Sequence, residues 1–207
     1  MRRLIFAGGL LLAVTPYLVH GGKPFKNHPI GERLTAAGNS SRWNGVKFEA
    51  DLIGADEVPP FVTETRGAFK IKFNEDFTAA RFKLRVLKGE AITQAHLHCA
   101  PEGVNGPVVV FLSGNVPGGF AVHGVLADFT MTNENIAAVN ANCTASIGRT
   151  IANLADLAHA ASNGLIYANV HSVAHPGGEI RGQLVDNDDD HDDEGDDDDD
   201  DDDDHDD

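Results

Sequence analysis

Apolar and polar residues alternate one by one along three stretches between residues 46 and 86. The apolar positions are Val46, Phe48, Ala50 and Leu52 in the first stretch, Phe69, Ile71 and Phe73 in the second, and Phe82, Leu84 and Val86 in the third. Successive side chains of a β-strand point to opposite sides, so a period of two predicts three half-buried strands. Residues 74–76 supply a hairpin turn between the second and the third.

Further strands are predicted at residues 107–112, 120–129, 165–171 and 179–185, between turns rich in Gly, Pro and Asn. About eight short strands of this kind predict an all-β fold, an antiparallel Greek-key-like β-sandwich or barrel. One stretch differs from this pattern. Its apolar residues have helical spacing, which predicts one inserted helix over residues 147–162, and Gly164 lies where that helix would stop.

The beginning of the chain has the pattern of a secretory signal peptide. Arg2 and Arg3 precede an apolar run from Leu4 to Val14, which is too short to span a bilayer. We therefore expect a signal peptide over residues 1–21, a flexible segment over 22–45 and one domain over 46–185. The protein is expected to be secreted or periplasmic, with no membrane span after removal of the signal.

The net charge of −16 is concentrated at the end of the chain. Residues 186–207 contain 17 Asp and one Glu and no Lys or Arg, so the rest of the chain is close to neutral. A near-neutral body gives no case for nucleic-acid binding, which requires a clustered basic face. We expect the Asp-rich tail to be disordered, with weak calcium binding through its carboxylates.

The chain has two cysteines, Cys99 and Cys143. In an oxidising compartment such a pair is expected to form a disulfide bond. The alternative is that Cys99 acts as a thiolate metal ligand beside His98.

Histidines supply the candidate metal ligands. His96 and His98, in "QAHLHC", lie two residues apart and therefore on the same face of an extended strand. His171, in "LIYANVH", completes a three-histidine site if the two strands are neighbours, and His123 and His175 are further candidates. Neutral imidazole suits copper and zinc, so either ion is the expected cofactor.

Three charged residues are candidates for a structural role. Glu57, just before Pro59 and Pro60, is expected to form an ion pair with Arg181, for which Glu179 is the alternative partner. No nucleophile lies near them in sequence, and no catalytic residue is assigned.

Three ordered blocks of the sequence resemble a known family. The stretches "ADLIGADEVPPFVTETRGAF", "AHLHCAPEGVNGPVVVFL" and "LIYANVHSVAHPGGEIRGQL" are similar to the successive signature blocks of the chordin-type (CHRD) domain. This resemblance implies an extracytoplasmic β-rich domain. The H-x-H strand with its neighbouring disulfide is also similar in arrangement to copper/zinc superoxide dismutase, although the later Gly-rich loop and the arginine-bearing terminus of that family are missing.

Three functions follow from these observations. The first is a secreted or periplasmic CHRD protein that binds a transition metal, with copper favoured over zinc. The second is a non-catalytic extracellular interaction module that binds a protein or matrix ligand and has structural histidines. The third is a copper redox enzyme of the dismutase kind.

Overall fold

The computed structural model describes residues 45–139 and 142–187. The expected signal peptide, the expected flexible segment up to residue 44 and the acidic tail from residue 188 lie outside these ranges. Within the described residues, no helix is long and apolar enough to cross a membrane.

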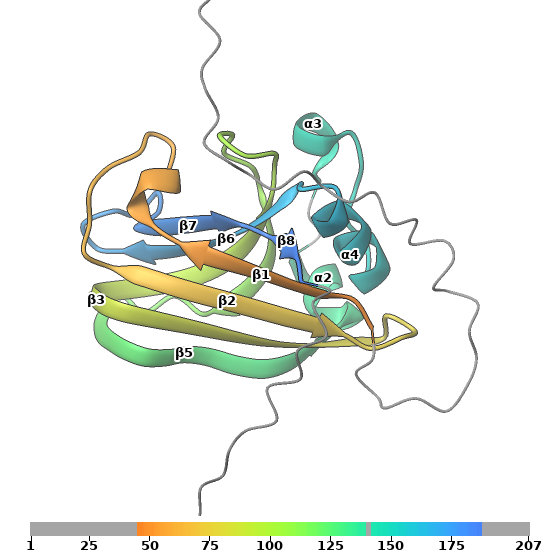
Figure 1. The fold of residues 1–207 in the computed structure, drawn as a ribbon, viewed down its shortest axis with the longest axis horizontal. Helices are drawn as coiled ribbons and strands as arrows, with labels where there is room; N and C mark the ends of the chain where they lie inside the picture. Colours follow the sequence, from red (N-terminus) through yellow and green to blue (C-terminus); the bar gives the residue numbers. More distant parts are fainter. Residues whose placement is uncertain (1–44, 140–141, 188–207) are drawn as a thin grey trace, which may run out of the picture.

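The described chain folds into a mostly antiparallel β-structure, a nearly closed six-strand barrel with a few short helices (Figure 1). The strands are β1 (Lys47–Leu52), β2 (Arg66–Phe73), β3 (Ala79–Cys99), β4 (Val108–Ser113), β5 (Phe120–Thr132), β6 (Ile166–Ser172), β7 (Ile180–Gln183) and β8 (Val185–Asp186). They follow the order β7–β6–β3–β2–β1–β8, with β4 and β5 added to β3. An isolated bridge between Ile53 and Arg181 joins the β1 and β7 ends of the barrel. The predicted antiparallel β fold is confirmed.

Strand β3 organises the barrel because it takes part in four pairings. Its first half pairs with β2 and β5, and its second half pairs with β4 and β6. The sequence predicts short strands, whereas β3 has 21 residues. Lys88 and Ala91 adopt positive φ angles of 53° and 47°, and the register with β5 shifts there, so the strand can change partners.

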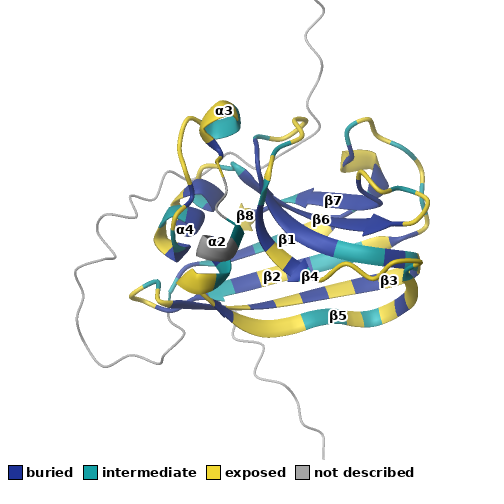
Figure 2. Cartoon of the chain, turned by 180° about the vertical axis from the view of Figure 1, so that it is seen from behind, coloured by how far each residue is buried: buried dark blue, intermediate teal, exposed yellow. Residues whose placement is uncertain are grey.

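The apolar face of the alternating stretches forms the core. Figure 2 shows buried and exposed residues in alternation along β2 and the first half of β3. Phe69, Phe82 and Leu84 are fully buried in this core. From Ala95 to Cys99 every residue of β3 is buried, so both faces of the strand are covered there.

The inserted helical region differs from the prediction. It contains three short helices, α2 (Asn133–Val139), α3 (Thr144–Ile147) and α4 (Leu154–Ser162). A single helix over residues 147–162 is therefore wrong, because α3 ends at Gly148, where φ is 75°. The α4 helix starts at its own cap, where the side chain of Asn153 accepts a hydrogen bond from the Asp156 amide. Gly164 follows α4 with φ of 67°, as its predicted stop position requires.

The disulfide bond between Cys99 and Cys143 ties the end of β3 to the start of α3. Their Cα atoms lie 6.1 Å apart. The predicted bridge is confirmed, so Cys99 offers no thiolate to a metal.

We expect the double variant Cys99→Ala/Cys143→Ala to lose about 3–4 kcal/mol of unfolding free energy, because the bond closes a long loop in the unfolded chain. Equilibrium urea unfolding measures this loss. The urea midpoint of wild-type protein should shift toward that of the variant when reductant is added. An unchanged midpoint in the variant would contradict the stabilising role of the bridge.

Candidate metal centre

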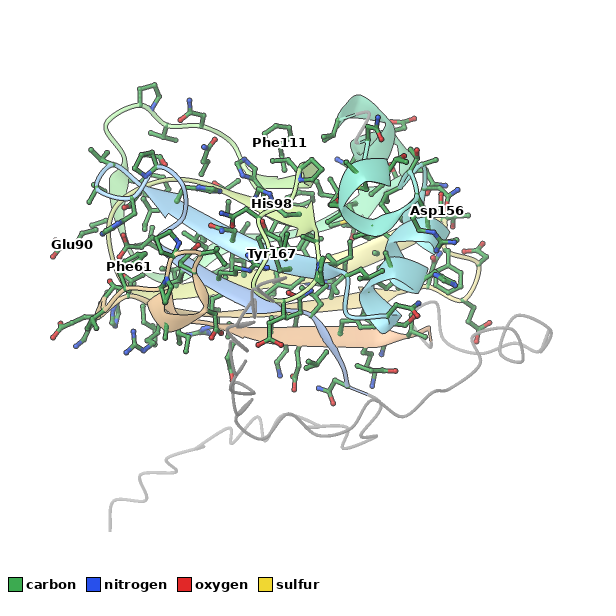
Figure 3. The ribbon with its side chains drawn as sticks, turned by 90° about the horizontal axis from the view of Figure 1, so that it is seen from above. Phe61, Glu90, His98, Phe111, Asp156 and Tyr167 are labelled. Atoms are coloured by element: carbon green, nitrogen blue, oxygen red, sulfur yellow. A yellow bond between two sulfur atoms is a disulfide. The ribbon has the colours of Figure 1, made fainter. Side chains whose placement is uncertain are left out.

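The candidate site lies where the second half of β3 runs antiparallel to β6. The register places His96 opposite Asn169 and His98 opposite Tyr167, while His171 lies opposite Gln94. Ala95 and Leu97 point into the apolar core. His96 and His98 therefore project together from the other face of the strand, as the sequence predicts. Figure 3 shows His98 and Tyr167 next to each other at this position.

Three loops cover this face of the sheet. The loop after β3 contacts it through Gly106, whose amide donates to the hydroxyl of Tyr167 at 3.1 Å. The loop after β1 contacts it through Glu57, which accepts a 3.4 Å hydrogen bond from Asn169, and the loop after β6 does so through Pro176. As a result, the exposed fractions of His96, His98 and His171 are only 4%, 8% and 5%.

Two backbone carbonyls fix the protonation of two imidazoles. Nδ1 of His98 lies 2.9 Å from the carbonyl oxygen of Gly106, and Nδ1 of His171 lies 3.0 Å from that of Pro176. Because a carbonyl only accepts, each Nδ1 must carry the proton, which leaves the lone pair on Nε2. A hydrogen bond of this kind on the second ring nitrogen is typical of metal-bound histidine.

Ring nitrogens of the three histidines lie close together. His96, His98 and His171 each offer a ring nitrogen, and these atoms all lie within 4.8 Å of one another. Nδ1 of His96 lies 3.0 Å from Nε2 of His171. Two nitrogens bound to one ion at 2.0–2.1 Å lie about 2.9–3.4 Å apart for angles between a right angle and the tetrahedral value. The 3.0 Å separation of these two nitrogens lies in this range, and it is also the length of an N–H···N hydrogen bond.

The unpartnered Nε2 of His98 supports a metal site. Nε2 of His98 and Nε2 of His96 are buried without a hydrogen-bond partner in the described part of the chain. A buried polar atom without a partner costs free energy, so such atoms are rare. For His98, the lone pair on Nε2 has no acceptor role in the protein, and a metal ion would satisfy it.

Burial keeps these imidazoles neutral. It lowers the pKa of His96 to about 3, with further contributions from His171 and His98. It also lowers the pKa of His98 to about 4, against the raising effect of the Gly106 carbonyl, and it lowers the pKa of His171. At neutral pH a metal ion would therefore not compete with protons for the ring nitrogens.

Aromatic rings hold the histidines in place. The ring of Tyr167 stacks on His98, with centroids 4.9 Å apart and an interplanar angle of 8°. The guanidinium carbon of Arg181 lies over the Tyr167 ring, 3.5 Å from its centroid. Phe111 packs its ring edge-on against His96 at 4.9 Å and is itself 53% exposed. The buried ring of Tyr167 thus supports the site, and the partly exposed ring of Phe111 covers it toward solvent.

The two further candidate histidines lie outside the three-histidine group. His123 is exposed on β5, and its Nδ1 accepts a 3.4 Å hydrogen bond from the amide of Lys88. His175 stacks on Phe61 with centroids 4.0 Å apart, and its Nε2 lies 3.8 Å from the carboxylate of Glu179. Neither position brings a ring nitrogen into the group.

Glu57, Glu179 and Arg181 are all buried beside the site. The carboxylate of Glu179 accepts hydrogen bonds from the hydroxyls of Thr63 and Ser172, at 2.6 and 2.8 Å. Arg181 donates to the side-chain oxygen of Asn105 and the carbonyl of Pro101. Its charge acts on Glu57 through space and lowers the pKa of that carboxyl, but burial prevails and raises it to about 7.

Sequence reasoning missed the carbonyls of Gly106 and Pro176 and the ring of Phe111. Backbone acceptors leave no mark in a side-chain pattern. Their only signals are the turn sequences "NG" and "HPGG", which place bends beside the two histidine strands.

A family model for the CHRD domain matches residues 48–184. The chain belongs to the CHRD-domain family. No curated protein and no solved structure matches it. The three histidines, Glu57 and Arg181 all lie inside the matched range, so the candidate metal centre is part of the CHRD domain itself.

The raised pKa of Glu57 predicts a pH-dependent stability. Since the fold favours the protonated carboxyl, this contribution is fully present below about pH 4.5 and is lost as the pH rises through about 7. In Glu57→Gln, the fall in unfolding free energy between pH 5 and 8 should be smaller than in wild type by on the order of 2 kcal/mol. Urea unfolding across this range measures it. Glu64→Gln is the control, because Glu64 is exposed and pairs with Lys88. Equal slopes for wild type and Glu57→Gln would contradict the assignment.

Proposed function

We propose that this CHRD domain binds one transition-metal ion through His96, His98 and His171. The supporting observation is the convergence of three buried, neutral imidazoles within 4.8 Å of one another. The two carbonyl hydrogen bonds that orient His98 and His171 strengthen the proposal, because they point the Nε2 lone pairs into the group.

Copper is the favoured ion and zinc the alternative. Imidazole binds both, but at a given nitrogen site divalent copper binds more tightly than divalent zinc. A thiolate ligand would favour zinc or monovalent copper, and the disulfide bond removes that ligand here. The bound ion would supply Lewis acidity and, for copper, one-electron chemistry.

The disulfide bond also supports the proposal that the protein acts outside the cytoplasm, because such bonds persist in oxidising compartments. The proposed location is the periplasm or the extracellular space.

Titration of the full chain with Cu(II) and Zn(II) tests metal binding. Calorimetry should give one tight equivalent in wild type, separate from the weak binding expected of the acidic tail. In His96→Ala/His98→Ala this equivalent should weaken by at least 100-fold, because only one of the three nitrogens remains. Copper in the wild-type site should show nitrogen hyperfine coupling by electron paramagnetic resonance.

His123→Ala is the matched control, since this exposed histidine lies outside the group, and it should keep the tight equivalent. If the double variant binds copper as well as wild type, the proposed site is wrong. In that event the histidines are structural, and the domain is better regarded as an interaction module for a protein or matrix ligand.

The ligand count favours redox catalysis as a second candidate function. Among the described residues, only three side chains join the group, and metal sites with three protein ligands keep a position for a small molecule. Copper-loaded wild type should then consume superoxide faster than the same concentration of aqueous copper. Spectrophotometric assay measures the rate, with His96→Ala/His98→Ala as the comparison. A rate no higher than that of free copper would reject catalysis and leave metal binding intact.

A further inference from the structure

The outer side of β1, β2 and the first half of β3 is rich in positive charge. The inner residues of these strands are buried in the core, so the residues between them face outward. We call the following six outward residues the basic face: Lys47, Lys70, Lys72, Arg81, Lys83 and Arg85.

The strand register places like charges directly opposite one another. Lys47 pairs with Lys72 across β1 and β2, and Lys72 pairs with Arg81 across β2 and β3. In the next row, Lys70 lies opposite Lys83. Like charges in direct register destabilise a sheet, so this arrangement calls for neutralisation.

The described carboxylates neutralise only part of the basic face. The carboxylate of Asp128 forms ion pairs with Arg81 and Lys83, at 3.5 and 3.2 Å. The carboxylate of Glu49 lies 3.9 Å from the ammonium group of Lys70. In the two described ranges, no carboxylate lies within 4.0 Å of the charged groups of the other three members of the face. These three members are Lys47, Lys72 and Arg85.

The chain leaves the barrel at the edge of this face. Strand β8 pairs with β1, and the amide of Asn187 donates to the carbonyl of Lys47 at 3.1 Å. The side chain of Asn187 donates to Glu49 at 2.8 Å. The segment that follows, residues 188–207, contains 17 acidic residues in 20 and no Lys or Arg. It begins one residue after an anchor on the strand that holds Lys47.

Length and geometry allow this segment to cover the face. Twenty residues reach at most about 66–72 Å when extended. Three neighbouring strands are about 10 Å across, because adjacent strands lie about 4.8 Å apart. A short tether also gives an effective concentration of about millimolar, well above that of an anionic molecule in dilute solution.

We propose that residues 188–207 bind the basic face of their own chain. The segment supplies the counter-charges that Lys47, Lys72 and Arg85 lack among the described carboxylates. The contact is electrostatic and exposed, so it weakens as salt shortens the screening length from about 10 Å at 0.1 M toward 3 Å at 1 M.

Zero-length carbodiimide crosslinking of the full chain, followed by mass spectrometry, tests the proposal. Carbodiimide joins Asp or Glu to Lys only when the two groups touch. At low salt, crosslinks from residues 188–207 should concentrate on Lys47 and Lys72, the two lysines of the face with no described carboxylate within 4.0 Å, and should fall several-fold in 1 M NaCl. Lys88, which is exposed and pairs with Glu64 at 3.2 Å, should receive few of them.

The variant Lys72→Gln/Arg81→Gln should reduce tail crosslinks to Lys47 several-fold. The Glu64–Lys88 crosslink in the same sample should be unchanged, which reports that the barrel is folded. The matched control Lys88→Gln should leave tail crosslinks to Lys47 at the wild-type level.

Two outcomes would overturn the proposal. Crosslinks spread evenly over the exposed lysines, with Lys88 as reactive as Lys47, would show that the tail has no preferred surface. In a mixture of isotopically light and heavy protein, light–heavy crosslinks would show that a second copy occupies the face. Neither outcome bears on metal binding, which the three histidines determine.

Discussion

The structure depends on the antiparallel register between the second half of β3 and β6. Side chains alternate along a strand, so a slip of one residue would move His96 and His98 into the apolar core and bring Leu97 to the site. The burial of Ala95 and Leu97 among core residues therefore fixes the direction of both histidines. Hydrophobic burial stabilises the fold and also positions the ligands. No additional loss of side-chain entropy is needed to direct them toward the site.

Loop chemistry then decides that these histidines are suited to bind an ion. The second nitrogen of each neutral imidazole could have accepted a hydrogen bond from an N–H or O–H group of the protein, which would leave a packed polar cluster. Instead, the carbonyls of Gly106 and Pro176 accept hydrogen bonds from Nδ1 of His98 and of His171, which leaves Nε2 of each ring directed into the group. Position 106 requires a residue without a side chain, because a Cβ there would overlap the carbonyl oxygen of Cys99. The turn that orients His98 is thus packed directly against the disulfide-bonded end of β3.

The sequence allows prediction of those features that rest on local periodicity. Alternation predicts the strands, and the two-residue spacing predicts that His96 and His98 share a face. The pairing of Cys99 with Cys143 follows from the expected oxidising compartment and from the presence of two cysteines in the sequence. Features that depend on tertiary capping are not predictable in this way. The start of α4 at Leu154 is set by the Asn153 cap and the left-handed Gly148, although the apolar spacing continues back to Ile147. The hydrogen bonds of Arg181 go to Asn105 and Pro101, which are far from it in sequence.

The barrel separates two kinds of electrostatic environment along one strand. Around His96 and His98, burial keeps the imidazoles neutral and leaves nitrogen donors, which suit borderline ions. Around Lys83, the outer face is exposed and charged, and its natural partners are carboxylates. Both positions lie on β3, and the change of environment accompanies its change of pairing partners from β2 and β5 to β4 and β6. Carboxylates prefer hard cations such as calcium. One strand thus presents nitrogen donors for a borderline ion in its second half and a charged surface for carboxylates in its first half.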